Sequence, residues 1–466
     1  MLNNEEKIPI SPNRVSEVEE FNSEVFQVLV SIVSGIVLYA FVDIYWVTII
    51  GFSTVIYSFL WYMESLGRGS AIMQIMQVIA SFQWILGPII AYHFGGETLK
   101  YRMYVPEDVY MDFAVPAVIF FMLGLRIFNS RVSLNTIASY VKQGGLSSIH
   151  IFLLMLIGLT VEFIVPFIPR SLYFAAYILA QFKYIGLLYF IVVDHRLRWH
   201  FTFAIFLLSL ISSAEEGLFH GLILWSALIF SYICVVIQFS RFRKIIIFAI
   251  SIFLMISLQT IKGDYRELIA ASSSTNQSNI SILIDMLMGS TLDNNDGESK
   301  TDIGDLNARL NQGWIISAVM NNVPSKQPFV EGETVITAVS DSLIPRFLLE
   351  KRNVLVSDNF KKFTGLELGI ATSMGISVLG ESYVNFGVFG GVIFMFFWGV
   401  IIATLMKIII EMSKNHPTII LWTPLIFLQM VKAETEIAVV LNHGIKTSIA
   451  IGLFYFTAKK IFGWKI

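Results

Sequence analysis

The sequence predicts an all-α membrane protein that crosses the bilayer many times. Of its 466 residues, 55% are hydrophobic and only 14% are charged, and the mean hydropathy is +0.70. Soluble domains carry about 25% charged residues, so this chain must keep much of its surface away from water. Apolar runs follow one another over most of the sequence. They favour one polytopic bundle over two or three soluble domains.

About twelve apolar segments are long enough, or nearly so, to span a bilayer. They lie near residues 25–42, 44–62, 71–93, 110–127, 150–168, 171–193, 200–213, 217–239, 245–260, 387–410, 418–432 and 436–457. We therefore divide the chain into a cytoplasmic N-terminal segment (1–24), a transmembrane bundle of about nine helices (25–260), a large extracytoplasmic loop with amphipathic helices (261–386), and C-terminal transmembrane helices with a short cytoplasmic tail (387–466).

The distribution of Lys and Arg predicts the orientation. If the N-terminus is cytoplasmic, the inside segments carry sixteen Lys and Arg residues and the short outside loops carry four. This positive-inside bias places both termini in the cytoplasm and the 261–386 loop outside. Residues 1–24 are polar and acidic, so we expect no cleavable signal peptide and a multi-pass protein of the cytoplasmic (inner) membrane.

Several chemistries find no support in the sequence. Cys234 is the lone cysteine, which rules out an intramolecular disulfide and a cysteine-based zinc site. The loop contains no nucleotide P-loop and no metal-binding pattern, so we expect no cofactor, no metal and no nucleic-acid partner. The loop also lacks histidine, so it cannot supply a Ser-His or a His-base mechanism by itself.

The loop contains two segments with helical patterns. In residues 305–320, Leu306, Leu310 and Trp314 recur at helical spacing, which predicts an amphipathic helix against the membrane or on the bundle. Residues 332–344 form a second, weakly amphipathic segment that Pro345 ends. Within the spans, Glu162 and Lys183 need a partner, which is either each other or a polar cavity.

A group of cations lies where the chain leaves or re-enters the membrane. Headgroup contact or loop salt bridges would explain them without a ligand. The alternative is an anion site, because guanidinium groups match phosphate oxygens bidentately and several can neutralise a pyrophosphate. These candidate binding residues, which we call the loop cations, are Arg266, Arg309, Arg346, Lys351 and Arg352. Lys432, in a short outer loop, is a further candidate.

Glu381 is the preferred general base. It lies in GISVLGESYVNFG, just before an apolar run, where a carboxylate is costly to dehydrate unless it is paired or working. Glycines on both sides allow the backbone to bend, and Tyr383 offers a ring for a sugar. Glu367 and Asp305 are the next candidates for the base. The structural alternative is that Glu381 pairs with Arg346 or another loop cation.

Five motifs in order carry a resemblance to a known family. SLIPRFLLEKRNVL, FKKFTGLELGIATSMGIS and LGESYVNFGVFGG follow IKGDYRE and DLNARLNQGW, and one large outer loop lies late in the chain. This layout resembles the bacterial oligosaccharide repeat-unit polymerases, the Wzy-type O-antigen and exopolysaccharide polymerases. It covers about residues 260–400. One departure is LLEKRN, where the family often has an aromatic-Pro-x-Lys-Pro run.

The resemblance implies a GT-C-like bundle and a membrane glycosyltransferase that needs no cofactor. Such an enzyme transfers the growing glycan from undecaprenyl pyrophosphate to the next lipid-linked unit at the outer face of the cytoplasmic membrane. Its donor and its acceptor are both undecaprenyl-pyrophosphate-linked oligosaccharides, and candidate protein partners are a chain-length regulator and a flippase. Cations near the developing charge of the leaving pyrophosphate would stabilise the transition state more than the ground state.

Two rival functions remain open. A transporter, including a flippase of lipid-linked glycans, also fits about twelve spans with both ends inside. Major-facilitator carriers, however, show two similar halves and a long link after span six, where this chain has only DHRLRW. The second rival is an O-antigen ligase-like enzyme, which uses the same donor but relies on a loop histidine that is absent here.

Overall fold

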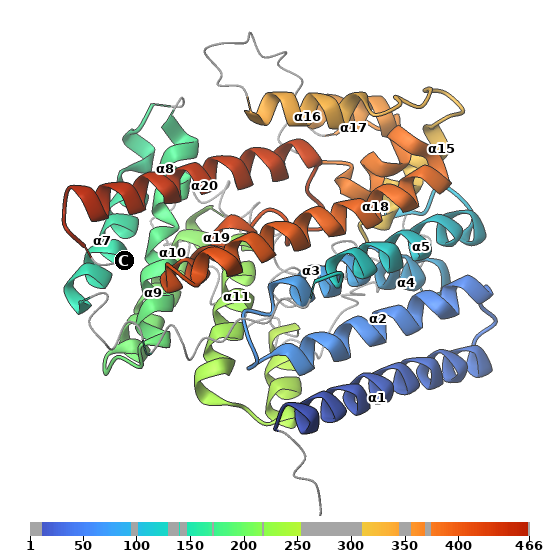
Figure 1. The fold of residues 1–466 in the computed structure, drawn as a ribbon. Coiled ribbons are helices and arrows are strands. Elements are labelled where there is room, and N and C mark those ends of the chain that lie inside the picture. Colours follow the sequence, from blue (N-terminus) through green and yellow to red (C-terminus); the bar gives the residue numbers. More distant parts are fainter. Residues whose placement is uncertain are drawn as a thin grey trace, which may run out of the picture.

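The computed structural model describes residues 12–94, 101–128, 139, 147–169, 172–216, 219–252, 310–343, 356–368 and 374–464. Within these ranges the regular structure is helical, with one isolated bridge between Leu66 and Gly69 (Figure 1). Nine of the described helices are long and apolar enough to cross a membrane. The prediction of an all-α polytopic membrane protein is therefore confirmed at this level, and the count of twelve spans stays a prediction.

The N-terminal half supplies seven of these candidate spans. Three of the seven consist of more than one element. The helices are α1 (Pro12–Phe41), α2 (Trp46–Ser65), α3 (Ile72–Ser81) with η1 (Phe82–Leu86) and α4 (Gly87–His93), α5 (Glu107–Leu125), α7 (Ser148–Ile164) with η3 (Val165–Phe167), α8 (Tyr173–Ala180) with α9 (Phe182–Val192), and α11 (His220–Ile237). The shorter α10 (Arg198–Glu216) is apolar from Arg198 to Ala214.

The C-terminal half holds the two remaining spans, three loop helices and two short elements between the two spans. These elements are α15 (Gly313–Asn322), α16 (Glu333–Leu343), α17 (Val356–Thr364), α18 (Ser377–Ser413), η5 (Pro417–Trp422), α19 (Thr423–Ile426) and α20 (Ile437–Lys460). Helix α18 packs along α5, where Gly124 and Gly399 lie so close to the facing backbone that an added Cβ would be 2.3 Å and 2.5 Å from a carbonyl oxygen. Small residues thus let the two helices approach closely.

The third span contains a π-helical turn, η1, that receives the chain from the loop. A π turn leaves a backbone carbonyl free. The carbonyl of Gln83 accepts a hydrogen bond from the backbone N–H of Gln312 at 3.0 Å. Gly87 allows this contact, because a Cβ there would lie 2.5 Å from the Cα of Asn311. The bend in α3–α4 therefore anchors the start of α15.

Helix α15 lies within residues 305–320, where an amphipathic helix against the membrane or on the bundle is predicted, and it is more fully buried than such a helix would be. It begins at Gly313, and all but one of its ten residues are buried. Trp314 packs edge-on against Tyr101 and Phe360, and Ser317 accepts a hydrogen bond from the backbone N–H of Tyr104 at 3.1 Å. Neighbouring elements, rather than water, therefore cover nearly all sides of the helix. Residues 305–309 of the predicted helix lie outside the described ranges.

The predicted span 418–432 is not a continuous helix. It forms the 3₁₀ turn η5 and the four-residue α19, and Pro417 and Pro424 limit helix length there. Every residue from 417 to 428 is buried. Tyr232 donates a hydrogen bond to the carbonyl of Ile420 at 3.1 Å, and the indole of Trp422 donates to Tyr189 at 3.2 Å. Irregular backbone of this kind is tolerated at membrane depth only where it is buried in protein or lines a water-filled cavity.

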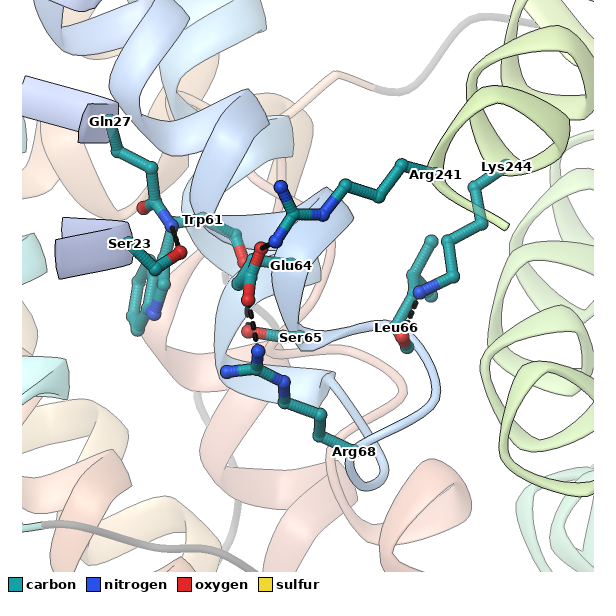
Figure 2. A network of polar contacts seen from close by, with 9 residues as sticks. All are labelled: Ser23, Gln27, Trp61, Glu64, Ser65, Leu66, Arg68, Arg241 and Lys244. Carbon is teal, nitrogen blue, oxygen red and sulfur yellow. Dashed lines mark hydrogen bonds and ion pairs between the residues drawn. The ribbon is translucent and has the colours of Figure 1, made fainter. Parts of the chain in front are cut away.

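Charged residues at the α2–α3 turn form an ion-pair network (Figure 2). Glu64 accepts from Arg68 and from Arg241, the latter at 3.2 Å, and Lys244 donates to the backbone carbonyl of Leu66. Arg241 and Lys244, which are among the cations that predict the topology, therefore also join residues 241–252 to this turn. Of the two alternatives for Glu162 and Lys183, the structure shows the pair with each other, which links α9 to α7.

Candidate carboxyl site at the start of α18 and α20

Helix α18 is two helical segments joined at a kink. Gly387 has φ 65° and ψ −162°, a conformation that only glycine adopts readily. The ring of Phe329 would lie 3.5 Å from a Cβ at this position. The kink separates the ten residues Ser377–Phe386, which carry Glu381, from the apolar remainder of the helix. The helix therefore bends at the residue where an apolar run begins.

Glu381 and Glu436 cap each other's helices. Glu381 Oε1 accepts a hydrogen bond from the backbone N–H of Ile437, the first residue of α20, at 2.7 Å. Glu436 Oε1 accepts from the backbone N–H of Ile376, directly before α18, at 3.1 Å. Free N–H groups and the positive end of the helix dipole favour a carboxylate at such a position. Two helix N-termini consequently meet with two carboxyl groups between them.

The carboxyl pair is buried and has polar neighbours. Glu381 and Glu436 are each 3% exposed. The side chain of Thr334 forms a hydrogen bond with the carboxyl of Glu381, and the side chain of Asn359 forms one with the carboxyl of Glu436. Asn385 donates to the hydroxyl of Thr334 at 2.7 Å, whereas its own Oδ1 is buried with no hydrogen-bond partner. The pair thus draws on α16, α17, α18 and α20.

The electrostatics of the pair are those of two like charges. Burial raises the pKa of Glu436 to about 7, and its hydrogen bonds from Ile376 and Asn359 offset part of that rise. Glu436 in turn acts on Glu381 as a like charge. Neither carboxyl forms an ion pair within the described part of the chain. A buried carboxyl pair without a cation tends to hold a proton.

An open cleft of about 400 Å³ lies next to the helical segment that carries Glu381. Its lining residues are Gln327, Pro328, Phe329, Val330, Glu331, Glu333 and Lys362. Phe329 packs 5.8 Å from the ring of Tyr383, and the backbone N–H of Val330 donates to the carbonyl of Val384 at 3.1 Å. The cleft therefore combines both signs of charge with an aromatic ring.

The structure places the other predicted residues at different positions. Tyr383 is buried, donates to the carbonyl of Val323 at 3.3 Å and packs on Phe113, so its ring is part of the core. Glu367 lies on the surface in an ion pair with Lys361 at 2.7 Å, which lowers its pKa and makes it a weaker base.

Lys432 lines a small cavity together with Trp84 and Trp398. Burial lowers the pKa of its ammonium group, and Glu434 offsets part of this effect. Asp305 and all five loop cations, Arg266, Arg309, Arg346, Lys351 and Arg352, lie outside the described residues. The predicted anion site is therefore not placed relative to the carboxyl pair.

Glu436 was missed by sequence reasoning. It directly precedes an apolar run in AETEIAVV, which is the same pattern that singled out Glu381. That signal was available, but the proximity of two residues 55 positions apart was not. Among the described residues, no group of three or more His, Cys, Asp or Glu side chains is arranged to hold a metal ion.

A family model described as Domain of unknown function (DUF8712) matches residues 113–430, which is more than half of the chain. The chain belongs to this family. The DUF8712 match contains Glu381 and ends before Glu436. No curated protein and no solved structure matches the chain. The DUF8712 description names no activity.

Proposed function

We propose that this protein polymerises lipid-linked oligosaccharide repeat units at the outer face of the cytoplasmic membrane. The growing glycan leaves undecaprenyl pyrophosphate and joins a hydroxyl of the next lipid-linked unit. The five motifs and their order support the reaction class. The observation that carries the proposal is the buried Glu381–Glu436 pair, because two adjacent carboxyl groups without a cation are costly to maintain for stability alone.

In the proposed reaction, Glu381 is the general base. The carboxylate takes the proton of the acceptor hydroxyl while the hydroxyl oxygen forms a bond to the anomeric carbon of the donor glycan. The bond from that carbon to the pyrophosphate oxygen breaks, and the pyrophosphate leaves with the electron pair. Glu436, as a neighbouring like charge, makes proton uptake by Glu381 more favourable. Loop cations would stabilise the leaving pyrophosphate.

The test is a polymerisation assay with purified protein and a synthetic lipid-linked repeat unit, read as a ladder on a gel. Glu381→Gln keeps the shape and the hydrogen bond from Ile437 but cannot take a proton. We expect normal protein level and donor binding with no chain growth. The matched control is Glu64→Gln, which removes a partly buried carboxylate elsewhere and should still give the ladder. A well-folded Glu381→Gln protein that builds full-length polymer would exclude the catalytic role.

A flippase or another proton-coupled transporter is the second candidate. The irregular buried segment 417–428 favours it, because broken helices mark substrate and ion paths in many transporters. Gene deletion separates the two functions. Loss of a polymerase leaves single repeat units on the carrier or at the surface, whereas loss of a flippase leaves them inside. Loss of an O-antigen ligase-like enzyme would instead leave completed polymer on the lipid carrier.

A further inference from the structure

Helix α16 has one apolar stripe that no described element covers. Ile336, Val339 and Leu343 are 70%, 42% and 64% exposed. Their spacing of three and four residues puts them on one side of the helix. Ala338 and Ser342 are buried on another side, where α16 packs on α20 (Figure 1). Asp341, which is partly buried, also lies away from the stripe.

The direction of α16 follows from its first turn. Thr334 contacts Glu381 and Asn385 at the place where α18 and α20 begin. From there α16 runs along α20 in the same direction, toward the middle of that span (Figure 1). Its 11 residues measure about 16 Å, which is roughly half of the ~30 Å hydrocarbon core. A helix of this length that follows a spanning helix ends near the middle of the bilayer.

The exposure of α20 changes where α16 ends. No residue from 437 to 447 is exposed, whereas Ile449, Leu453 and Phe456 further along α20 are each about as exposed as the stripe. Over the first half of that span, α16 covers α20, and the stripe on α16 is the exposed apolar surface there. Over the second half, α20 itself supplies that surface. Because α20 is itself long and apolar enough to cross a membrane, this shared surface is continuous with one that lipid covers.

We propose that α16 is a half-span helix that enters the leaflet holding the N-terminal ends of α18 and α20, with Ile336, Val339 and Leu343 against lipid acyl chains. This helix is part of the region that the sequence assigns to a large extracytoplasmic loop. Lipid, rather than water, then borders the element that supplies Thr334 to the carboxyl pair. The inference does not depend on which reaction the protein catalyses.

The experiment measures nitroxide depth in liposomes. Cys234 is the lone cysteine, so Cys234→Ala provides a background for single cysteines at Ile336, Val339 and Leu343. Glu331→Cys is the aqueous control and Ile449→Cys is the lipid-facing control. We expect oxygen accessibility to exceed that of a water-soluble nickel collider at all three stripe positions. Label depth should increase by about 10 Å from residue 336 to residue 343.

Three outcomes would overturn the proposal. Equal depth at residues 336 and 343 would mean that α16 lies flat at the interface. Nickel accessibility at residue 343 matching that at Glu331 would mean that the stripe faces water. Low accessibility to both colliders would mean that protein, such as a second copy of the chain, covers it. Since all four substituted positions on α16 and α20 are exposed, these variants should fold.

Discussion

Two clusters of charged side chains in this protein differ in how their charge is balanced. At the α2–α3 turn, Glu64 lies between the guanidinium groups of Arg68 and Arg241 (Figure 2). At the start of α18 and α20, Glu381 faces another carboxyl, Glu436, and only hydrogen-bond donors surround the pair. The first arrangement is a structural contact, because the carboxylate is balanced by two cations. The second costs free energy unless the pair holds a proton or performs chemistry.

The strongest test of this contrast is activity. Under the proposed function, Glu381→Gln should reduce polymerisation by about 100-fold or more, since general bases contribute about 10²–10⁴-fold. Glu64→Gln should change it little, because that carboxylate is compensated by cations far from the carboxyl site. The measurement is the rate of ladder formation at equal protein level. Similar losses in the two variants would remove the distinction between the clusters.

The pH dependence of stability tests the carboxyl pair directly. Burial raises the pKa of Glu436 in the folded protein to about 7, above the value of 4.5 that applies when it is unfolded. The folded state therefore binds more protons between these two values. Stability from this group is fully present below about pH 4.5 and is lost as pH rises through about 7. Each unit of difference corresponds to about 1.4 kcal/mol.

We expect the apparent unfolding temperature in detergent to fall from pH 5 to pH 8. Glu436→Gln should flatten this fall, because glutamine cannot lose a proton, and the variant should be relatively more stable at pH 8. Glu64→Gln, which leaves the carboxyl pair intact, should retain the wild-type decline. If Glu436→Gln and the wild type show parallel curves, Glu436 does not titrate in this range.

Gly387→Ala should disturb the carboxyl pair and leave the ion-pair network at the α2–α3 turn intact. The residue holds φ 65° and ψ −162°, which costs a non-glycine residue about 1–3 kcal/mol. We expect a lower unfolding temperature and weaker activity, since the kink positions the segment that carries Glu381. Gly452→Ala is a suitable control, because nothing lies within 4 Å of its added Cβ on α20. Equal stability of the two variants would contradict the strain at the kink.

The smallest expected effect is that of Glu64→Gln on stability. Ion pairs near the surface contribute about 0.2–1 kcal/mol, and Arg241 is largely exposed. The variant should unfold slightly more easily, and added salt should reduce the difference from wild type. Glu436→Gln should show the opposite sign at pH 8. A stabilised Glu64→Gln protein would mean that the network does not hold the turn.

Composition and hydropathy alone determined that this chain is a helical membrane protein, because apolar runs of spanning length have few other stable forms. The pattern of a charge next to an apolar run also identified Glu381. Tertiary structure decided the rest: that Pro417–Ile426 is buried irregular backbone, and that α15 is covered on nearly all sides. It also brought Glu436 to Glu381. The sequence near Glu381 shows that its carboxyl group is costly to bury. Which second carboxyl lies beside it depends on where two helices begin in space, and the tertiary structure decides that.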